Sequence, residues 1–325
     1  MNSKKKMYKA VIIGAGRIAS SFDAPKSKNV LTHAHALVKH PRVELVGMMD
    51  VDSIHGKKEA KKWKTNFYSD LELMLKATSP EIVVIATPDE THLSILLDLM
   101  KKNTPLIICE KPVVTKRSDI AKVHLAAKQS KSAVLVNFRR RFDPTINKLR
   151  NDLVRGKYGT VLSANAVYTK GILHNGVHFI DLARHLFGEV RSSNMVFRVN
   201  DLALGAPSLG GTATLERCSQ FYLMNADERK YSVAEFEIFT AKKRFLFFHE
   251  GFTLMTEEVV PDPVFKGDHT LGKRKIEATG LIRSMSGLID NAVAVLEGRE
   301  TPHASLLDAL RTHETCFQLL NKYSK

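Results

Sequence analysis

The first 138 residues alternate short apolar runs with segments whose apolar residues recur every three or four positions. The runs are rich in Val, Ile and Leu and lack strict alternation, as expected for strands covered on both faces of a parallel sheet. They lie at residues 9–13, 43–49, 82–86, 106–109 and 133–138. Segments 69–75, 91–101 and 118–128 between them have helical spacing. This order predicts βαβ units, and so an α/β doubly wound Rossmann domain over residues 1–138.

After residue 138 the pattern changes to longer, partly alternating segments, which predict the strands of a mostly antiparallel sheet. These segments lie at residues 161–170, 191–199, 212–224 and 231–248. Residues 276–296 and 305–320 have the spacing of helices. We therefore predict a second, α+β domain over residues 139–325, and a length of 325 residues fits two domains of ordinary size.

A glycine-rich loop directly follows the first predicted strand. In the pattern Gly14-x-Gly16-x-x-Ala19, Gly14 permits a tight turn and Gly16 lets a pyrophosphate approach the backbone, while Ala19 stands where helix and strand pack closely. The pyrophosphate of a dinucleotide would lie at the start of the following helix, beside Arg17 and Ile18. By itself the loop is also compatible with a simple glycine-rich turn.

Asp50 ends the second predicted strand, where a carboxylate can bind the adenine ribose hydroxyls and repel a 2′-phosphate. An inserted loop at residues 20–32 accounts for its distance from the glycines. This position favours NAD over NADP, although Lys57 and Lys58 leave NADP open. Asp50 capping only its own turn is the alternative.

The composition narrows the functional classes. With 44% apolar and 26% charged residues the chain is typical of a globular protein, and no stretch approaches the roughly 18 apolar residues of a membrane span. A net charge of +15 is spread along the chain without a nucleic-acid motif, which indicates a solvated basic surface or attraction of an anionic substrate. Three widely spaced cysteines predict neither disulfides nor a metal site and favour the cytoplasm.

The chain resembles the glucose-fructose oxidoreductase and inositol dehydrogenase family, known as Gfo/Idh/MocA. The segments that carry the resemblance are residues 14–19, Ala86, Thr87 and Pro88 with His92, Glu110 to Pro112, 137–144 and 176–188. The resemblance implies a Rossmann domain followed by an open-faced sheet domain. It also implies that Thr87, Pro88, His92 and Glu110 lie at the cofactor, that Lys111 reaches the nicotinamide ribose and the substrate, and that a cis peptide bond precedes Pro112.

Oxidation of a secondary alcohol requires a group that takes the hydroxyl proton while hydride leaves for the nicotinamide. We predict His178 as that acid/base and Lys111 as the cation that stabilises the developing alkoxide. The alternative for His178 is a histidine at a helix start that is satisfied by local hydrogen bonds. Arg139 to Arg141 either help to join the two domains or form a solvated turn.

One residue departs from the family pattern. Many members have an aspartate four residues before the histidine, and this chain has His174 there. Residues four apart are neighbours on a helix, but a second histidine supplies no carboxylate; Asp181 either substitutes for it or pairs with nearby Arg184 or His185. The catalytic mode is thereby open.

We predict substrate contacts from Tyr168, Lys170, His174 and Asn175, because they lead into His178. The resemblance implies a polyhydroxylated substrate, namely a sugar, an inositol or a nucleotide sugar, and the basic charge favours an anionic one. A non-catalytic NAD(P)-sensing regulator of the same fold is the alternative function. An open sheet face would also favour a homodimer or homotetramer.

Overall fold

The computed structural model describes residues 6–201 and 205–323, which fold into two compact units. The first comprises the described parts of Met1–Phe142 together with Ile282–Leu310, and the second comprises Asp143–Leu281 with Arg311–Lys325. The first unit extends four residues past the predicted boundary at residue 138, and residues 282–310, which we predicted for the second domain, cluster with the first unit. Helix α8 (Ser284–Leu296) packs on α1, β5 and β6 of the first unit, because its apolar face, with Leu288 and Ile289, is buried there.

A six-stranded parallel sheet forms the centre of the first unit, in the order β3-β2-β1-β4-β5-β6. The strands are β1 (Tyr8–Ile13), β2 (Val43–Met49), β3 (Asn66–Tyr68), β4 (Ile82–Ile85), β5 (Leu106–Cys109) and β6 (Ala133–Val136). All four residues of β4 and of β5 are fully buried, which explains their continuous apolar runs. The chain order reverses between β1 and β4, and ligands of such sheets bind at that point, outside the carboxyl ends of the strands.

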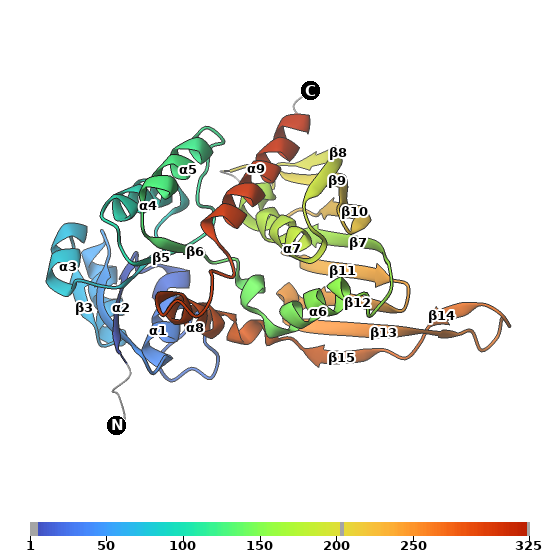
Figure 1. The fold of residues 1–325 in the computed structure, drawn as a ribbon, viewed down its shortest axis with the longest axis horizontal. Coiled ribbons are helices and arrows are strands. Elements are labelled where there is room, and N and C mark those ends of the chain that lie inside the picture. The colour runs from blue at the N-terminus through green and yellow to red at the C-terminus, as the bar shows by residue number, and fades with distance from the viewer. Residues whose placement is uncertain (1–5, 202–204, 324–325) are drawn as a thin grey trace. The chain divides into compact units, whose positions relative to one another are not determined.

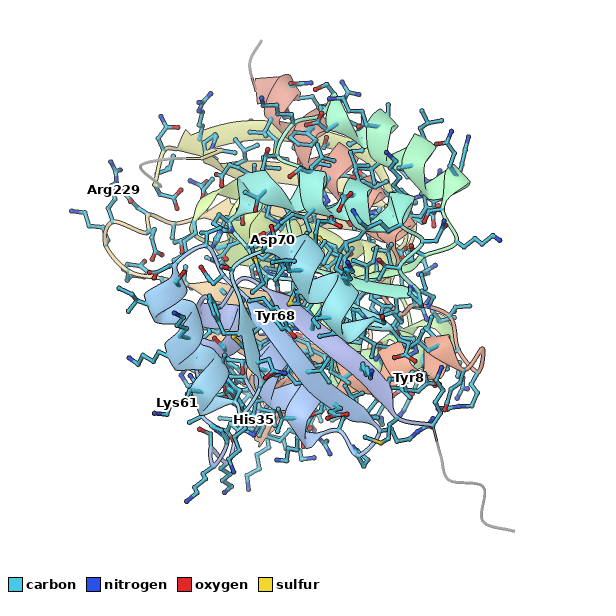
Figure 2. The ribbon with its side chains drawn as sticks, turned by 90° about the vertical axis from the view of Figure 1, so that its left-hand side faces the viewer. Tyr8, His35, Lys61, Tyr68, Asp70 and Arg229 are labelled. Atoms are coloured by element: carbon cyan, nitrogen blue, oxygen red, sulfur yellow. The ribbon has the colours of Figure 1, made fainter. Side chains whose placement is uncertain are left out.

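The helices of the first unit follow its strands in chain order. They are α1 (His33–Lys39), α2 (Ser53–Lys62), α3 (Leu71–Thr78), α4 (His92–Lys101) and α5 (Asp119–Gln129), with short turns η1 (Arg17–Ser21), η2 (Asp89–Thr91) and η3 (Arg139–Phe142). Thr32, Asp52 and Asp70 cap α1, α2 and α3, since each side chain accepts a hydrogen bond from a backbone N–H of the first turn. Helices α1 and α8 pack together, as do α4 and α5 (Figure 1). Lys61, near the end of α2, is exposed (Figure 2).

The second unit is built on a mixed sheet in the order β14-β13-β12-β11-β7-β10-β9-β8, with β15 beside β13. Among its described pairs only β10 and β7 run parallel, so the mostly antiparallel prediction is confirmed. The strands are β7 (Val161–Tyr168), β8 (Val190–Val199), β9 (Ser208–Leu215), β10 (Cys218–Asn225), β11 (Ala234–Thr240), β12 (Lys243–Phe248), β13 (Thr253–Pro261), β14 (His269–Leu271) and β15 (Lys275–Ala278). Helical segments are α6 (Pro144–Val154), η4 (Gly171–Gly176), α7 (Val177–Phe187), η5 (His249–Gly251) and, at the unit boundaries, η6 (Gly280–Arg283) and α9 (Leu306–Tyr323).

One face of this sheet is covered by α7. Alternate residues of β11 are buried. The ring of Phe236 packs against those of Phe179, Phe187 and Phe221, at centroid distances of 6.2, 6.3 and 6.1 Å. On the opposite face, Tyr222 of β10 is 41% exposed. Within this unit the sheet is therefore open-faced, as the resemblance implied.

Candidate functional site

The glycine loop turns sharply at the carboxyl end of β1. Gly14 has a φ of +92°, and its N–H donates a hydrogen bond to the Met49 carbonyl at 2.7 Å. A Cβ at Gly14 would lie 2.6 Å from the Ala86 carbonyl oxygen, whereas a Cβ at Gly16 would meet nothing within 4 Å. Gly14 thus serves the fold of the loop, and Gly16 leaves free surface that an incoming phosphate group can use.

The helix predicted after this loop is shorter than expected. Arg17–Ser21 form a single π-helical turn, and α1 begins only at His33. The segment between them is irregular, as predicted for the inserted loop, and Asp23 holds it together. The Asp23 carboxylate accepts hydrogen bonds from the Leu31 N–H and the Thr32 hydroxyl, both at 2.6 Å, and from His35 Nδ1 at 2.8 Å.

Asp50 lies directly against the glycine loop. Its Oδ2 accepts a hydrogen bond from the Ala15 N–H at 2.6 Å, and its Oδ1 accepts one from the Asp52 N–H at 2.8 Å. The Ala15 carbonyl in turn accepts a hydrogen bond from His55 Nε2 at 2.8 Å. Asp50 therefore caps its own turn, and its carboxylate lies beside the glycine loop.

His92 is a buried residue that connects two backbone segments. Its side chain is buried, and its two ring nitrogens lie 2.8 Å from the carbonyl oxygens of Pro112 and Thr87. It thereby ties the end of β4 to the turn after β5. The prediction that it lies near the strand ends is correct in position, but its polar atoms are committed to the backbone. Thr87 is half-buried and Pro88 is exposed beside it.

Glu110 is also committed to internal partners. Its Oε1 accepts hydrogen bonds from His33 Nε2 at 2.8 Å and from Asn137 Nδ2 at 2.7 Å. Burial alone would raise the pKa of this carboxyl group, but the bonds from His33 and Asn137 and the nearby Lys111 lower it below its usual value. The carboxylate of Glu110 therefore faces the protein interior, and its predicted place among the cofactor contacts does not fit this burial.

Lys111 follows Glu110 at the carboxyl edge of the sheet, and its peptide bond to Pro112 is cis, as the resemblance implied. The side chain is partly exposed, and removal of water around it lowers the pKa of its ammonium. Glu110 and Asp89 oppose this shift, and Arg140 adds to it. Burial likewise raises the pKa of Asp89, which Lys111 opposes. Lys111 is thus a poorly solvated cation that Glu110 and Asp89 favour electrostatically, and such a cation is suited to stabilising developing negative charge.

In the second unit, His174 and His178 lie on one continuous helical run. The π-helical turn η4 leads directly into α7, with His174 exposed in the turn and His178 partly exposed in the first turn of α7. Asn175 is half-buried between them. Residues four apart on such a run lie near one another on its surface.

The run begins at a tightly held turn. Lys170 has a φ of +68°, its N–H donates to the Asp201 carboxylate at 2.7 Å, and its ammonium pairs with Glu228 at 3.1 Å. Ser208 donates to the same Asp201 carboxylate and accepts a bond from the Gly171 N–H at 2.9 Å. These contacts fix where the helical run starts.

Tyr168 does not fit the predicted substrate role. It is fully buried and packs beside Phe179, and its hydroxyl exchanges hydrogen bonds with the backbone N–H and carbonyl of Leu209 at 2.7 and 2.9 Å. Sequence proximity to His178 was misleading, because alternate residues of a strand face opposite sides and Tyr168 faces the core.

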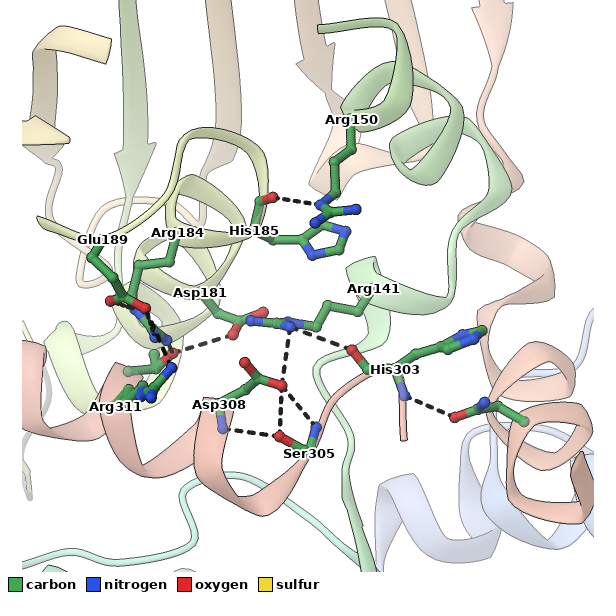
Figure 3. A network of polar contacts seen from close by, with 12 residues as sticks. Arg141, Arg150, Asp181, Arg184, His185, Glu189, His303, Ser305, Asp308 and Arg311 are labelled. Carbon is green, nitrogen blue, oxygen red and sulfur yellow. Dashed lines mark hydrogen bonds and ion pairs between the residues drawn. The ribbon is translucent and has the colours of Figure 1, made fainter. Parts of the chain in front are cut away.

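Asp181 is buried and accepts a hydrogen bond from the Thr312 hydroxyl of α9 at 3.2 Å (Figure 3). Arg184 forms a two-pronged ion pair with Glu189, at 2.9 and 2.8 Å. The hydrogen bond from Thr312 favours a structural role for Asp181 over the role of substitute carboxylate considered from the sequence.

Arg141 in the basic run is a buried residue of the first unit. Its guanidinium pairs with Asp308 at 3.4 Å and donates to the His303 carbonyl at 3.3 Å (Figure 3). Asp308 also accepts the Ser305 hydroxyl bond at 2.6 Å. Arg141 therefore attaches residues 303–308 to the first unit, and the solvated-turn interpretation is wrong for it.

Sequence reasoning missed several residues that hold the site. His33, Asn137 and Asp89 adjoin Glu110 and Lys111, while His55 and Asp201 hold the loop and the helical run. Only Asn137 and Asp89 carried a signal, since Asn137 lies near the end of one predicted parallel strand and Asp89 follows another. Among the described residues, no group of three His, Cys, Asp or Glu side chains is arranged to hold a metal ion. Nor does that part of the chain contain a helix whose length and apolarity suit a membrane crossing.

Residues 8–138 match a family model described as an oxidoreductase family with an NAD-binding Rossmann fold. The chain is 28% identical over 182 residues to an inositol 2-dehydrogenase of Rubrobacter xylanophilus, covering 52% of this chain and 51% of that protein. It is 30% identical over 134 residues to inositol 2-dehydrogenase 2 of Saccharopolyspora erythraea, covering 38% and 39%. The chain thus spans about half, or less, of the length of these curated relatives.

Solved structures share the fold over nearly the whole chain. Levoglucosan dehydrogenase, in complex with NADH and levoglucosan, has a TM-score of 0.81 at 16% identity and covers 98% of this chain and 97% of its own. The WlbA dehydrogenase of Chromobacterium violaceum, in complex with NADH and UDP-GlcNAcA, has a TM-score of 0.74 at 16% identity, with coverages of 99% and 95%. At these identities the likeness concerns the fold alone.

Proposed function

Because this chain belongs to the Gfo/Idh/MocA family of oxidoreductases, we propose that it transfers hydride between a nicotinamide dinucleotide and a secondary alcohol or ketone of a sugar, an inositol or a nucleotide sugar. The observation that carries the proposal is the position of Lys111, which follows β5 and precedes a cis peptide bond at the carboxyl edge of the sheet that also bears the Gly14 loop. The named relatives act on such polyols or bind such sugars, which supports this substrate class.

The residues of the first unit fit a dinucleotide. Free surface over Gly16 suits a pyrophosphate, and Asp50 suits the adenine ribose hydroxyls. Arg17, Ile18, Thr87 and Pro88 are the further contacts that we propose from the loop and the end of β4. When bound, the nicotinamide ring supplies the hydride acceptor or donor.

Two side chains handle the remaining charge and proton in this proposal. Lys111 orients the substrate oxygen and stabilises it as negative charge develops. His178 takes the hydroxyl proton during oxidation and returns it during reduction. Lys170, His174 and Asn175 contact the other hydroxyl or acidic groups of the substrate.

An absorbance screen at 340 nm tests the function. The protein is incubated with NAD or NADP and a panel of sugars, inositols and nucleotide sugars, in both reaction directions. Turnover on at least one panel member is expected, with preference for NAD. Saturating cofactor binding without turnover on any member would contradict the enzymatic proposal.

That contrary result would favour the second candidate, a cofactor-sensing regulator without catalysis. The specific observation in its favour is the exposed His174 at the position where many family members have an aspartate. No carboxylate at that position raises the basicity of His178 or orients it.

Asp50 provides the test of cofactor preference. Asp50→Asn removes the negative charge but retains an oxygen that accepts from the Ala15 N–H, whereas Asp50→Ala removes both. We expect Asn to reduce the preference for NADH over NADPH by about tenfold or more, since the repulsion of a 2′-phosphate is lost. Fluorescence titration with both reduced cofactors measures this. An unchanged preference in the Asn variant would show that Asp50 serves only its own turn.

His178 and His174 provide the test of proton transfer. His178→Gln is expected to lower kcat by roughly 10²- to 10⁴-fold with little change in cofactor affinity. His174→Asp restores the carboxylate that many family members have, and we expect it to raise kcat and to shift the acidic limb of the pH–rate profile. Equal turnover of His178→Gln and the parent protein would exclude His178 as the acid/base.

We propose that the chain assembles into a homodimer or homotetramer through the open face of the sheet in the second unit. Phe197, Tyr222 and Met224 line an apolar groove on β8–β10 and are 66, 41 and 44% exposed. We expect Tyr222→Asp to dissociate the oligomer in light-scattering measurements, because an aspartate would be buried without a partner. Leu125→Asp, at an apolar position on α5 that is 60% exposed, is the control. A monomeric parent protein would contradict this.

A further inference from the structure

We infer that His33 and Asn137 are positioning residues that act on Lys111 through the buried carboxylate of Glu110. The inference deepens the proposed function, because Lys111 is the cation on which that function depends. It concerns residues from three separate segments: the first residue of α1, the residue after β5 and the residue after β6.

Two of the three side chains converge on one oxygen atom of the third. His33 Nε2 and Asn137 Nδ2 both donate to Oε1 of Glu110, at 2.8 and 2.7 Å, and the other oxygen, Oε2, accepts the Lys111 N–H at 3.3 Å. His33 is 0% exposed, Asn137 3% and Glu110 7%. In such close packing a change of side-chain rotamer is energetically costly, so the two donors hold the Glu110 carboxylate in place.

The donors also fix its charge. A buried carboxyl group without donors would favour the neutral form, and the His33 and Asn137 bonds reverse this for Glu110 by lowering its pKa. Lys111 also lowers the pKa of Glu110, and Glu110 in turn adds to the burial that raises the pKa of the adjoining Cys109 thiol.

The charge of Glu110 in turn supports the ammonium of Lys111. Burial lowers the pKa of Lys111; Glu110 and then Asp89 oppose this, and Arg140 reinforces it. Asp89 is itself influenced by His92 and Glu90. Glu110 is the largest of the influences that keep Lys111 protonated, so removing its charge would move the deprotonation of Lys111 to lower pH.

A contribution to stability does not by itself explain the presence of His33 and Asn137 at these buried positions. Within the described part of the chain, His33 Nδ1 and Asn137 Oδ1 are buried without a hydrogen-bond partner. Buried polar atoms of this kind disfavour folding. Each residue therefore contributes one useful polar atom, and in both cases that atom is bonded to Glu110.

The same helix contains a matched control. His35, two residues further along α1, is also buried and also pairs with a carboxylate at 2.8 Å, but the carboxylate is Asp23. His35→Ala thus removes a buried histidine–carboxylate pair from α1 without touching Glu110.

The experiment follows the titration of Lys111 by NMR in protein labelled with ¹³C-lysine, with its Cε signal assigned by its loss in Lys111→Arg. We expect His33→Ala and Asn137→Ala each to lower the pKa of Lys111 by about half a unit or more, towards the limit set by Glu110→Gln. His33→Gln, whose amide can still donate, should show a smaller shift, and His35→Ala none.

Three results would overturn the inference. The first is an unchanged pKa of Lys111 in Asn137→Ala, which also serves if His33→Ala fails to fold. The second is a further shift when His33→Ala is added to Glu110→Gln, since the two should not add. The third is an equal shift in His35→Ala. The titration needs neither cofactor nor substrate, so an inactive protein that shows the expected shifts would sink the proposed function and leave this inference standing.

Discussion

Lys111→Met is expected to lower turnover by roughly 10²- to 10⁴-fold while the protein remains folded. Methionine approximates the length of the lysine side chain but carries no charge, so the substrate oxygen would lose the cation that stabilises it. The measurements are kcat and KM on the best substrate of the screen, with Lys116→Met, at an exposed position five residues further on, as the control. Turnover of Lys111→Met close to that of Lys116→Met would contradict the role of Lys111.

The same variant should not lose stability at neutral pH. Because folding lowers the pKa of Lys111, the unfolded chain binds more protons at this site than the folded one in the interval between the two pKa values. The cost of holding the charged lysine is therefore full below the folded pKa and disappears as the pH rises towards 10.5. We expect the Tm of Lys111→Met at pH 7 to equal or exceed that of the parent protein. A clearly lower Tm would mean that the interactions of the ammonium with Glu110 and Asp89 stabilise the folded protein by more than its desolvation costs.

Gly14→Ala should produce the second large effect, a loss of stability by about 2 kcal/mol or more together with a loss of dinucleotide binding. Alanine at a φ of +92° is strained, and its Cβ would lie 2.6 Å from the Ala86 carbonyl oxygen, so β4 and the loop must move apart. Urea unfolding and NADH titration measure the two losses.

Gly16→Ala separates folding from binding at the neighbouring glycine. Gly16 has a φ of −66°, which alanine adopts readily, and its Cβ would meet no atom within 4 Å. We expect unfolding like that of the parent protein, but NADH binding weaker by about tenfold or more, because the methyl group occupies the surface meant for the pyrophosphate. Unchanged affinity in Gly16→Ala would place the cofactor elsewhere.

Most of the parallel sheet was predictable, because its strands are continuous buried apolar runs and β4, with Ile82–Ile85, lies wholly in the core. Strand β3 was missed, since its three residues are exposed or half-buried and too few to show a pattern. The hairpins β9–β10 and β11–β12 were each read as one segment, because their two-residue turns at 216–217 and 241–242 contain neither glycine nor proline. Strand β15 was likewise merged into the predicted helix 276–296, which begins only at Ser284.

The candidate site was predictable where it is local. Gly14 and Asp50 could be placed because a turn after one strand and a carboxylate after the next meet at the same edge of the sheet. The internal role of Glu110 could not be foreseen, since its partner His33 lies 77 residues away in the chain. The assignment of α8 to the first unit was similarly invisible, because helical spacing reveals that one face is buried but not against which strands.

Fluorescence titration of the purified protein with NADH tests for the nicotinamide dinucleotide site on the first unit. We predict saturable binding of one NADH per chain, weaker in Gly16→Ala and in Asp50→Ala. Absence of saturable binding by NADH and by NADPH alike would contradict it, and with it both the oxidoreductase and the cofactor-sensing regulator.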